Sequence, residues 1–240
     1  MLLPIGTTTD GLGTNGLSLL LILVAMVPGI LAQARVRSTF GRYSQVRSRS
    51  GYTGTMAARR ILDAQGLHDV PIERIPGQLT DHFDPRTRIL RLSESTAEIP
   101  SVAAVGVAAH EAGHAMQHAA GYAPNRLRGF LVPIANIGSN AGPYLAIFGI
   151  LLGFGFLVNI GIALYAFAVL FFIVTLPVEY NASHRAMCAL EDTGILSEEE
   201  LAGARKVLNA AALTYLASAL AAVATLARLL LISRSGRRRS

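Results

Sequence analysis

The sequence is poor in charge and in cysteine. Only 15% of its 240 residues are charged and 52% are hydrophobic, whereas about 25% of the residues of a typical soluble domain are charged. The single cysteine, Cys188, cannot form an internal disulfide and says nothing about the redox compartment. These shortages exclude an ordinary soluble protein, a disordered chain and a disulfide scaffold. They leave an integral membrane protein with a modest polar domain.

Lysine is almost absent as well. Of the 21 basic residues, only Lys206 is a lysine, and the net charge is +6. Beside long apolar runs, basic residues mark the cytoplasmic face of a membrane more often than a nucleic-acid site. We therefore expect a lipid bilayer as the partner of this surface and no nucleic acid.

The apolar residues are gathered in three blocks: about Leu17–Ala34, Gly129–Leu176 and about Ala210–Ile232. The middle block has no charged residue in 48 positions. As one straight helix it would be about 72 Å long, more than twice a bilayer core of about 30 Å. We therefore expect a hairpin of two spans with a turn near Gly153–Asn159, and four spans in all.

The first block admits two interpretations, an uncleaved anchor or a cleaved signal peptide. The tripeptide Ala32-Gln33-Ala34 resembles a cleavage site. However, Met1–Gly16 has no basic residue, and five arginines follow between Arg35 and Arg49, where positive charge resists export. We favour an anchor with its N-terminus outside. The tendency of basic residues to stay on the cytoplasmic side conflicts with a full final span, because such a span would place the last arginines outside the cell.

These blocks divide the chain into five parts. The polar part is expected to begin with a basic linker at Ser38–Gly54, followed by a helix at Thr53–Gln65. Short extended segments follow at Val70–Ile75, Gln78–His82 and Arg88–Leu92, and a second helix spans 101–120. The expected parts are an anchor at 1–34, a catalytic domain at 35–128, a hairpin at 129–176, a second catalytic segment at 177–208 and a final span with a basic tail at 209–240.

The second helix carries the motif His110-Glu111-Ala112-Gly113-His114. Residues four apart share a helix face, so both histidines can bind one Zn²⁺ at about 2.0–2.1 Å. Glu111 is rotated by about 100° from His110, which suits a general base better than a ligand. The alternative is a histidine-rich helix packed on a sheet or membrane, but unpartnered titratable groups are costly there. The motif predicts a catalytic site with one Zn²⁺ per chain.

Catalytic zinc has three protein ligands and one open position, so a third ligand is required. His118 continues the spacing, but its Cα lies about 12 Å from that of His110, which favours a capping or hydrogen-bonding role. Glu179 is favoured because a carboxylate at a membrane edge needs a reason, and two crossings return the chain to the side of His110. The other candidates are Glu191, His184 and His82.

The chain resembles the YugP-type neutral zinc metallopeptidases, a family of prokaryotic membrane proteins. The resemblance extends from about Gly51 to Arg228 and is carried by four ordered stretches: Leu79–Pro85 with Leu90–Ser93, Val107–Ala115, Thr175–Glu179 with Ala182-Ser183, and Val207–Tyr215. Such a combination is far more specific than the histidine motif alone.

The resemblance implies a mainly α membrane protein with about four transmembrane helices and a small α+β, zincin-like (gluzincin) catalytic domain. In the wider HtpX-like group, a Glu after a membrane hairpin is the third zinc ligand, which supports Glu179. That group tends to have an Asp four residues later, where this chain has Ser183. Ser183 or Asn181 is expected to supply part of its hydrogen bonding, and the role of His184 stays open.

The predicted reaction is endopeptidase-type amide hydrolysis. Zn²⁺ held by His110, His114 and Glu179 lowers the pKa of its bound water to about 7. Glu111 takes the proton and delivers it to the leaving amine. A further donor to the oxyanion is usual, and its candidates are His184, Tyr180 and His82.

The expected substrate is a protein or peptide, including membrane proteins, paired with an edge strand near Ile89–Leu92. The expected location is the inner membrane of a prokaryotic cell, with the catalytic residues on the cytoplasmic side. Two other functions compete with this interpretation. One is a zinc-binding membrane scaffold or inactive peptidase-like adaptor, which the retained Glu111 argues against. The other is a zinc transporter, which the polar flanks of the His110 helix argue against.

Overall fold

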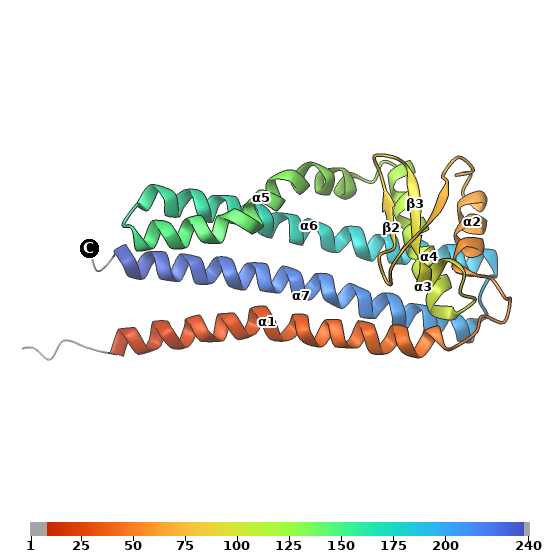
Figure 1. Ribbon diagram of the computed structural model, residues 1–240, viewed down its shortest axis with the longest axis horizontal. Coiled ribbons are helices and arrows are strands. Elements are labelled where there is room, and N and C mark those ends of the chain that lie inside the picture. Colours follow the sequence, from red (N-terminus) through yellow and green to blue (C-terminus); the bar gives the residue numbers. More distant parts are fainter. Residues whose placement is uncertain (1–8, 238–240) are drawn as a thin grey trace, which may run out of the picture. The chain divides into compact units, whose positions relative to one another are not determined.

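The protein is mainly helical, with one small sheet. The computed structural model describes the backbone of residues 9–237 and the side chains of residues 16–234, so the chain's last three residues and most of the expected basic tail lie outside the described part. The elements in this part are α1 (Thr9–Ser44), α2 (Gly54–Ala64), β1 (Ile72–Ile75), β2 (His82–Asp84), β3 (Ile89–Ser93), α3 (Glu94–Ala97), α4 (Val102–Ala119), α5 (Ala123–Leu151), α6 (Gly155–Thr193) and α7 (Glu198–Arg237) (Figure 1).

The chain divides into two compact units. The first, here called the membrane unit, comprises Met1–Leu31, Phe130–Ile173 and Leu216–Ser240. The second, here called the polar unit, comprises Ala32–Gly129 and Val174–Tyr215. The helices α1, α5, α6 and α7 each contribute residues to both units. Most of each apolar block falls in the membrane unit, and the histidine motif falls in the polar unit.

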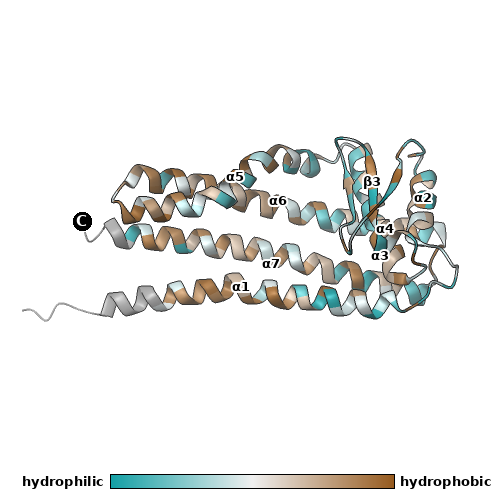
Figure 2. Ribbon diagram, viewed as in Figure 1, coloured by the Kyte–Doolittle hydropathy of each residue, from teal (hydrophilic) through white to brown (hydrophobic). Residues whose placement is uncertain are grey.

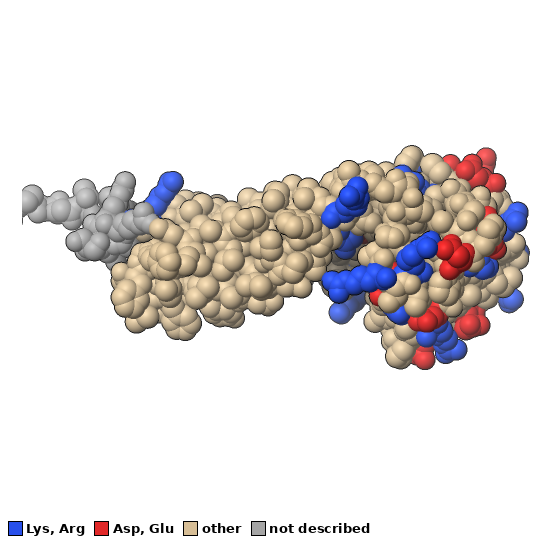
Figure 3. Space-filling model, turned by 90° about the horizontal axis from the view of Figure 1, so that it is seen from above, with Lys and Arg blue, Asp and Glu red and all other residues tan. Residues whose placement is uncertain are grey.

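Four helices in the described chain are long and apolar enough to cross a membrane: α1, α5, α6 and α7. Large apolar side chains on α1 face outward, and Leu19, Ile30 and Leu31 are each more than half exposed. Hydrophobic colour dominates the membrane unit in Figure 2, and in Figure 3 the charged side chains gather on the polar unit. Apolar surface of this extent requires lipid around it, so the protein is an integral membrane protein.

Within the membrane unit, α5 and α6 form the expected hairpin. The chain turns at residues 152–154, where Gly153 has a φ of 72°, a conformation that favours glycine. Small residues bring the two helices together: a Cβ on Gly138 would clash with the carbonyl oxygen of Leu164. The arrangement is typical of helix packing in membranes, where small residues permit close backbone approach.

Arg228, near the end of the last apolar block, has a partner in the same unit. The guanidinium of Arg228 on α7 donates a hydrogen bond of 3.0 Å to the hydroxyl of Ser18 on α1. A charged side chain at such a position needs polar company, and this bond joins two helices that are far apart in the sequence.

The polar unit is built around α4. Ser101 caps the helix by accepting a hydrogen bond from the backbone of Ala104 at 3.2 Å, and Gly121 follows its end with a φ of 62°, as the sequence predicts. The small residues of α4 are almost fully buried. They share one core with side chains of α2, β3, α6 and α7, namely Ile61, Leu62, Leu90, Leu92, Leu190 and Leu208.

The sheet has the strand order β1-β3-β2, with β1 parallel and β2 antiparallel to β3. The strand near Ile89–Leu92 is therefore the central strand and is hydrogen-bonded on both sides, so the prediction that it is an edge strand is wrong. β2 is an edge strand instead.

Two local expectations require correction. The expected linker at Ser38–Gly54 is helical as far as Ser44, because α1 continues and Tyr43 packs against the core of the polar unit. The second extended segment lies at His82–Asp84 rather than Gln78–His82, because Gly77 and Leu79 have positive φ angles of 102° and 55° and form a turn.

The start of α7 is fixed by a reciprocal cap. The backbone of Ser197 donates to Glu200 Oε2 at 2.8 Å, and the backbone of Glu200 donates to Ser197 Oγ at 3.4 Å, a capping box. The second oxygen of Glu200 accepts a hydrogen bond of 2.7 Å from the backbone of Arg49. The segment after α1 is thereby tied to the first turn of α7.

Close contact between α4 and α6 depends on Gly113. A Cβ at this position would lie 2.5 Å from the carbonyl oxygen of Ala182, a distance at which one helix must shift. Gly113 lies between the two histidines of the motif, and Ala182 is three residues from Glu179. The missing side chain therefore sets the separation of the helices that carry these groups.

We predict that Gly113→Ala destabilises the protein by about 1–3 kcal/mol, the usual cost of overpacking, and lowers its thermal unfolding midpoint. The matched control is Gly129→Ala on α5, where an added Cβ meets nothing within 4 Å and alanine favours a helix by about 1 kcal/mol over glycine. Thermal unfolding of the purified full-length protein in detergent measures both. Equal midpoints for the two variants would contradict the close approach.

Candidate metal centre

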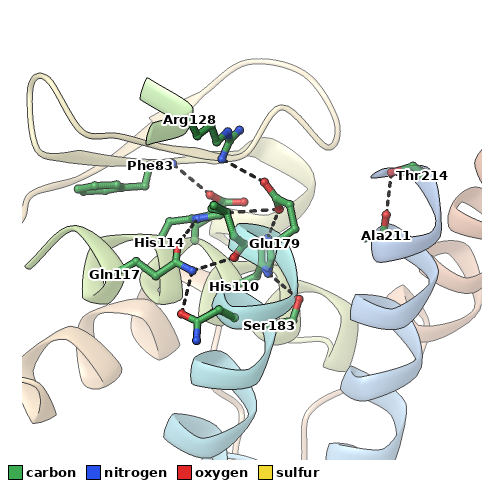
Figure 4. A network of polar contacts seen from close by, with 12 residues as sticks. Phe83, His110, His114, Gln117, Arg128, Glu179, Ser183, Ala211 and Thr214 are labelled. Carbon is green, nitrogen blue, oxygen red and sulfur yellow. Dashed lines mark hydrogen bonds and ion pairs between the residues drawn. The ribbon is translucent and has the colours of Figure 1, made fainter. Parts of the chain in front are cut away.

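The structure brings together the two histidines of α4 and Glu179 of α6 (Figure 4). The distance to Glu179 Oε2 is 3.2 Å from His110 Nε2 and 3.5 Å from His114 Nε2. One potential ligand atom from each of the three side chains lies within 4.8 Å of the other two. The two imidazole rings are nearly perpendicular, at 83°. Residues 69 positions apart in the sequence thus point their donor atoms at one small volume.

The group is largely withdrawn from solvent. The Glu179 side chain is 2% exposed, and those of His110 and His114 are 12% and 13% exposed. A buried carboxylate is costly unless it is paired or bound to a metal. The burial of Glu179 therefore requires positively charged partners, and its position between two imidazoles fits a metal ion as one of them.

Both histidines are oriented by a hydrogen bond at the other ring nitrogen. Nδ1 of His110 lies 3.1 Å from Ser183 Oγ, and Nδ1 of His114 lies 3.1 Å from Gln117 Oε1. When each Nδ1–H donates to its oxygen, each Nε2 keeps its lone pair for a ligand. Nε2 is the atom that faces Glu179 in both residues, so ring orientation and tautomer agree with metal binding.

Gln117 has its amide orientation fixed by two further bonds. Its Nε2 donates to the carbonyl oxygen of Val178 at 2.7 Å and to Asn181 Oδ1 at 3.0 Å. The amide nitrogen is therefore on the α6 side, and Oε1 faces His114. The side chain is fully buried. The sequence interpretation missed Gln117, although its position three residues after His114 places it on the same helix face.

Arg128 and Tyr215 also contact Glu179, and both were missed. Arg128 Nη1 lies 3.1 Å from Glu179 Oε1, the oxygen that does not face the histidines. The hydroxyl of Tyr215 hydrogen-bonds to the Glu179 carboxylate. Two signals in the sequence could have found them. Arg128 is the last charge before the uncharged block, and Tyr215 ends the fourth stretch that resembles the family.

Glu111 lies beside the three potential ligands and points to the sheet. Its Oε2 accepts a hydrogen bond of 3.0 Å from the backbone N–H of Phe83 on β2. Burial raises the pKa of Glu111 to about 7, an effect to which the charges of Glu179 and Asp81 add and which His110 and the Phe83 N–H oppose. Glu111 is not one of the converging ligand atoms, as expected for a residue one step round the helix from His110.

The remaining candidates lie in different surroundings. Ser183 is the hydrogen-bond partner of His110. Glu191 is 46% exposed and pairs with Arg205 at 3.0 Å. Among the described residues, the structure shows no hydrogen bond from the other four candidates to His110, His114 or Glu179. The ring of His118 lies 5.7 Å from that of Phe83, His82 bonds to the carbonyl of Thr80, and His184 contacts Cys188, while Tyr180 is half exposed.

The donor set fits zinc. Two imidazole nitrogens and one carboxylate oxygen are ligands that zinc accepts, and three protein ligands leave a fourth position open for water or substrate. The second hydrogen bonds at both histidines and at Glu179 are of the kind that orient ligands in zinc sites.

Comparison with known proteins points to the same class. The family described as "Putative neutral zinc metallopeptidase" matches residues 18–234. The protein of Bacillus subtilis (strain 168) named "Putative membrane protease YugP" is 45% identical over 221 residues, which cover 92% of this chain and 98% of that protein. No solved structure matches the chain.

We predict that Gln117→Leu lowers the affinity for zinc about 10–100-fold, the usual effect of removing a residue that orients a ligand. The substitution keeps a side chain of similar size but leaves His114 Nδ1 without its acceptor. Competition with a chromophoric chelator measures the affinity. Gln78→Leu, at an exposed turn, serves as the control, and an unchanged affinity in Gln117→Leu would show that His114 needs no such support.

Proposed function

The chain belongs to the neutral zinc metallopeptidase family, and on that premise we propose that it is a membrane-embedded zinc endopeptidase. His110, His114 and Glu179 hold one Zn²⁺ per chain, and Glu111 is the general base. The observation that carries this proposal is the convergence of three ligand atoms beside a buried glutamate that is not one of them. A small α+β catalytic domain of the zincin type is part of the same proposal.

Bound zinc would supply a Lewis acid that acidifies water and polarises the scissile carbonyl. Glu111 then acts as a proton carrier: Phe83 N–H occupies its Oε2, which leaves Oε1 to take a proton from water and pass it to the leaving amine. Arg128 and Tyr215 hold Glu179, while Ser183 and Gln117 hold the imidazoles. Each of these residues therefore has one role in the proposed reaction.

The proposed substrate is an extended protein or peptide segment that pairs with β2. The antiparallel register places Phe83 opposite Leu90 of β3, yet the N–H of Phe83 donates to Glu111 rather than to β3. The outer edge of β2 thus faces the general base. An extended peptide could add by β-augmentation to the backbone groups of this edge that Glu111 leaves free, and this would bring its scissile bond beside Glu111.

We place the catalytic residues on the cytoplasmic side of the inner membrane of a prokaryotic cell. Of the 21 basic residues, 16 lie between Arg35 and Lys206, which supports this orientation by the positive-inside trend. Because α7 is continuous from Glu198 to Arg237, a full final span would place the four arginines after it on the opposite side.

Two other functions are less well supported. A structural zinc site in a scaffold gains nothing from the buried Glu111 beside it. A zinc transporter would carry its histidines on a spanning helix, whereas α4 is not among the four candidate spans in the described chain and is covered by the core of the polar unit.

We predict that Glu111→Gln slows peptide cleavage by about 10²–10⁴-fold and retains about one zinc per chain. The amide can still accept the Phe83 N–H but cannot carry the proton. Cleavage of a peptide library by the purified protein, with metal analysis of the same samples, measures both properties. Glu98→Gln, an exposed carboxyl on the surface, is the control. Cleavage at the wild-type rate by Glu111→Gln would refute the mechanism, and a zinc-loaded wild type that cleaves nothing would favour the scaffold.

We predict that Glu179→Ala loses bound zinc, whereas Glu191→Ala keeps it. Both glutamates lie on α6 and both are candidates for the third ligand by sequence, but only Glu179 converges on the histidines. Metal content after dialysis against a defined zinc buffer measures the difference. Full zinc retention by Glu179→Ala, or zinc loss in Glu191→Ala alone, would remove Glu179 from the ligand set.

A further inference from the structure

The polar unit contains a cavity whose lining includes none of His110, Glu111, His114 and Glu179. Its volume is about 680 Å³, and residues of α1, α6 and α7 line it. This volume falls within the range of about 300–1,000 Å³ that is usual for small-molecule sites. The function proposed above makes no use of it.

Two helices present matched stripes of side chains to this cavity. Arg35, Ser38, Thr39 and Arg42 of α1 line it, with the spacing of one helix face. Lys206, Asn209, Ala210 and Leu213 of α7 line it with the same spacing. The cavity is therefore formed by helix surfaces and not by a loop.

The cavity is positively charged. Three of its lining residues are cations, namely Arg35, Arg42 and Lys206, and no acidic residue lines it. Within the described part of the chain, none of the three is among the residues that form ion pairs with Asp or Glu. Uncompensated cations in a concave surface attract an anion, and arginine suits phosphate oxygens in particular.

One part of the cavity is apolar. By sequence, it lies where the apolar blocks of α1 and α7 adjoin the polar parts of the same helices. The apolar block of α1 ends at Ala34, directly before Arg35, and the apolar block of α7 begins at Ala210, directly after Asn209. Ala210, Ala212 and Leu213 line the cavity beside the cations. A ligand with an anionic head and an apolar body matches this lining, whereas free phosphate would use only the charged part.

We propose that this cavity binds the phosphate headgroup of an anionic membrane phospholipid. Arg35, Arg42 and Lys206 contact the phosphate, Asn209 donates a hydrogen bond, and the alanines and Leu213 contact the glycerol and the first acyl carbons. Basic pockets of this kind at the cytoplasmic border of membrane helices bind anionic lipid heads. The site is saturable and takes one lipid per chain.

The test is a titration of the full-length protein in neutral detergent with dioctanoyl phosphatidylglycerol, followed by calorimetry. We expect saturable binding of one lipid per chain, at least about tenfold weaker binding of dioctanoyl phosphatidylcholine, and weak binding of inorganic phosphate. Equal affinity for the two lipids, or no saturable binding, would overturn the proposal. Phosphate that binds as tightly as the lipid would identify a free-phosphate site instead, and tighter binding of an oligoglutamate peptide would identify an acidic peptide site.

Substitutions of single basic residues distinguish a defined lipid site from diffuse electrostatic attraction. Arg42→Gln and Lys206→Gln should each weaken phosphatidylglycerol binding about fivefold, the effect expected of one basic residue near an anionic lipid. Arg37→Gln is the matched control, because Arg37 is exposed on α1 but does not line the cavity and its loss removes the same charge. Equal losses in all three variants would show that the attraction is diffuse.

Charge-conserving variants test whether a loss of lipid affinity reflects loss of the charge or loss of the fold. Arg42→Lys and Lys206→Arg should keep most of the affinity, and the zinc content of every variant should equal that of the wild type. A loss of affinity in Arg42→Lys as large as in Arg42→Gln, in a protein with normal zinc content, would show that charge is not what the cavity recognises.

Discussion

The burial of one carboxylate between two imidazoles is the interaction on which the polar unit depends. Glu179 is 2% exposed and lies 3.2 Å from His110, a position that would be costly for a charged group without positive partners. Each of the two oxygens of the Glu179 carboxylate has its own partners. The histidines, and by proposal a metal ion, face Oε2, and Arg128 faces Oε1. The close contact of α4 and α6 at Gly113 and Ala182 permits this burial. The packing of the two helices and the arrangement of the potential ligands therefore depend on the same contact.

The hydrogen bonds around the site show how narrowly this constraint is satisfied. The side-chain amide of Gln117 is bonded at both its oxygen and its nitrogen. The oxygen faces His114, and the nitrogen donates to Val178 and Asn181. Ser183 orients His110 from α6, and the edge of the sheet orients Glu111. Each of the three motif residues is therefore held by a different element or a different turn of a helix, and none relies on its own rotamer preference alone.

The features that could be predicted from the sequence are those set by local rules and by length. Ser101 and Gly121 bound α4 as capping rules require, and the 48-residue uncharged block folds back because no bilayer is thick enough for it. The features that could not be predicted depend on register between distant helices. Although signals in the sequence single out Arg128 and Tyr215, nothing local reveals that they meet Glu179, or that Gln117 reaches Val178. The position of β2 was missed for a related reason, because the positive φ of Leu79 is a conformation that leucine rarely adopts.

Helix geometry allows α6 to serve two sites with neighbouring residues. Glu179 points to the histidines of α4, while Tyr180, the next residue, lines the basic cavity with α1 and α7. Consecutive residues of a helix are rotated by about 100° from each other, so the two sites occupy different faces of one rigid element. Because both faces belong to the same turn, a lipid headgroup in the cavity and a metal ion among the ligands would each hold that turn in place. The segment directly after the hydrophobic hairpin is thus where membrane anchoring and the candidate chemistry meet.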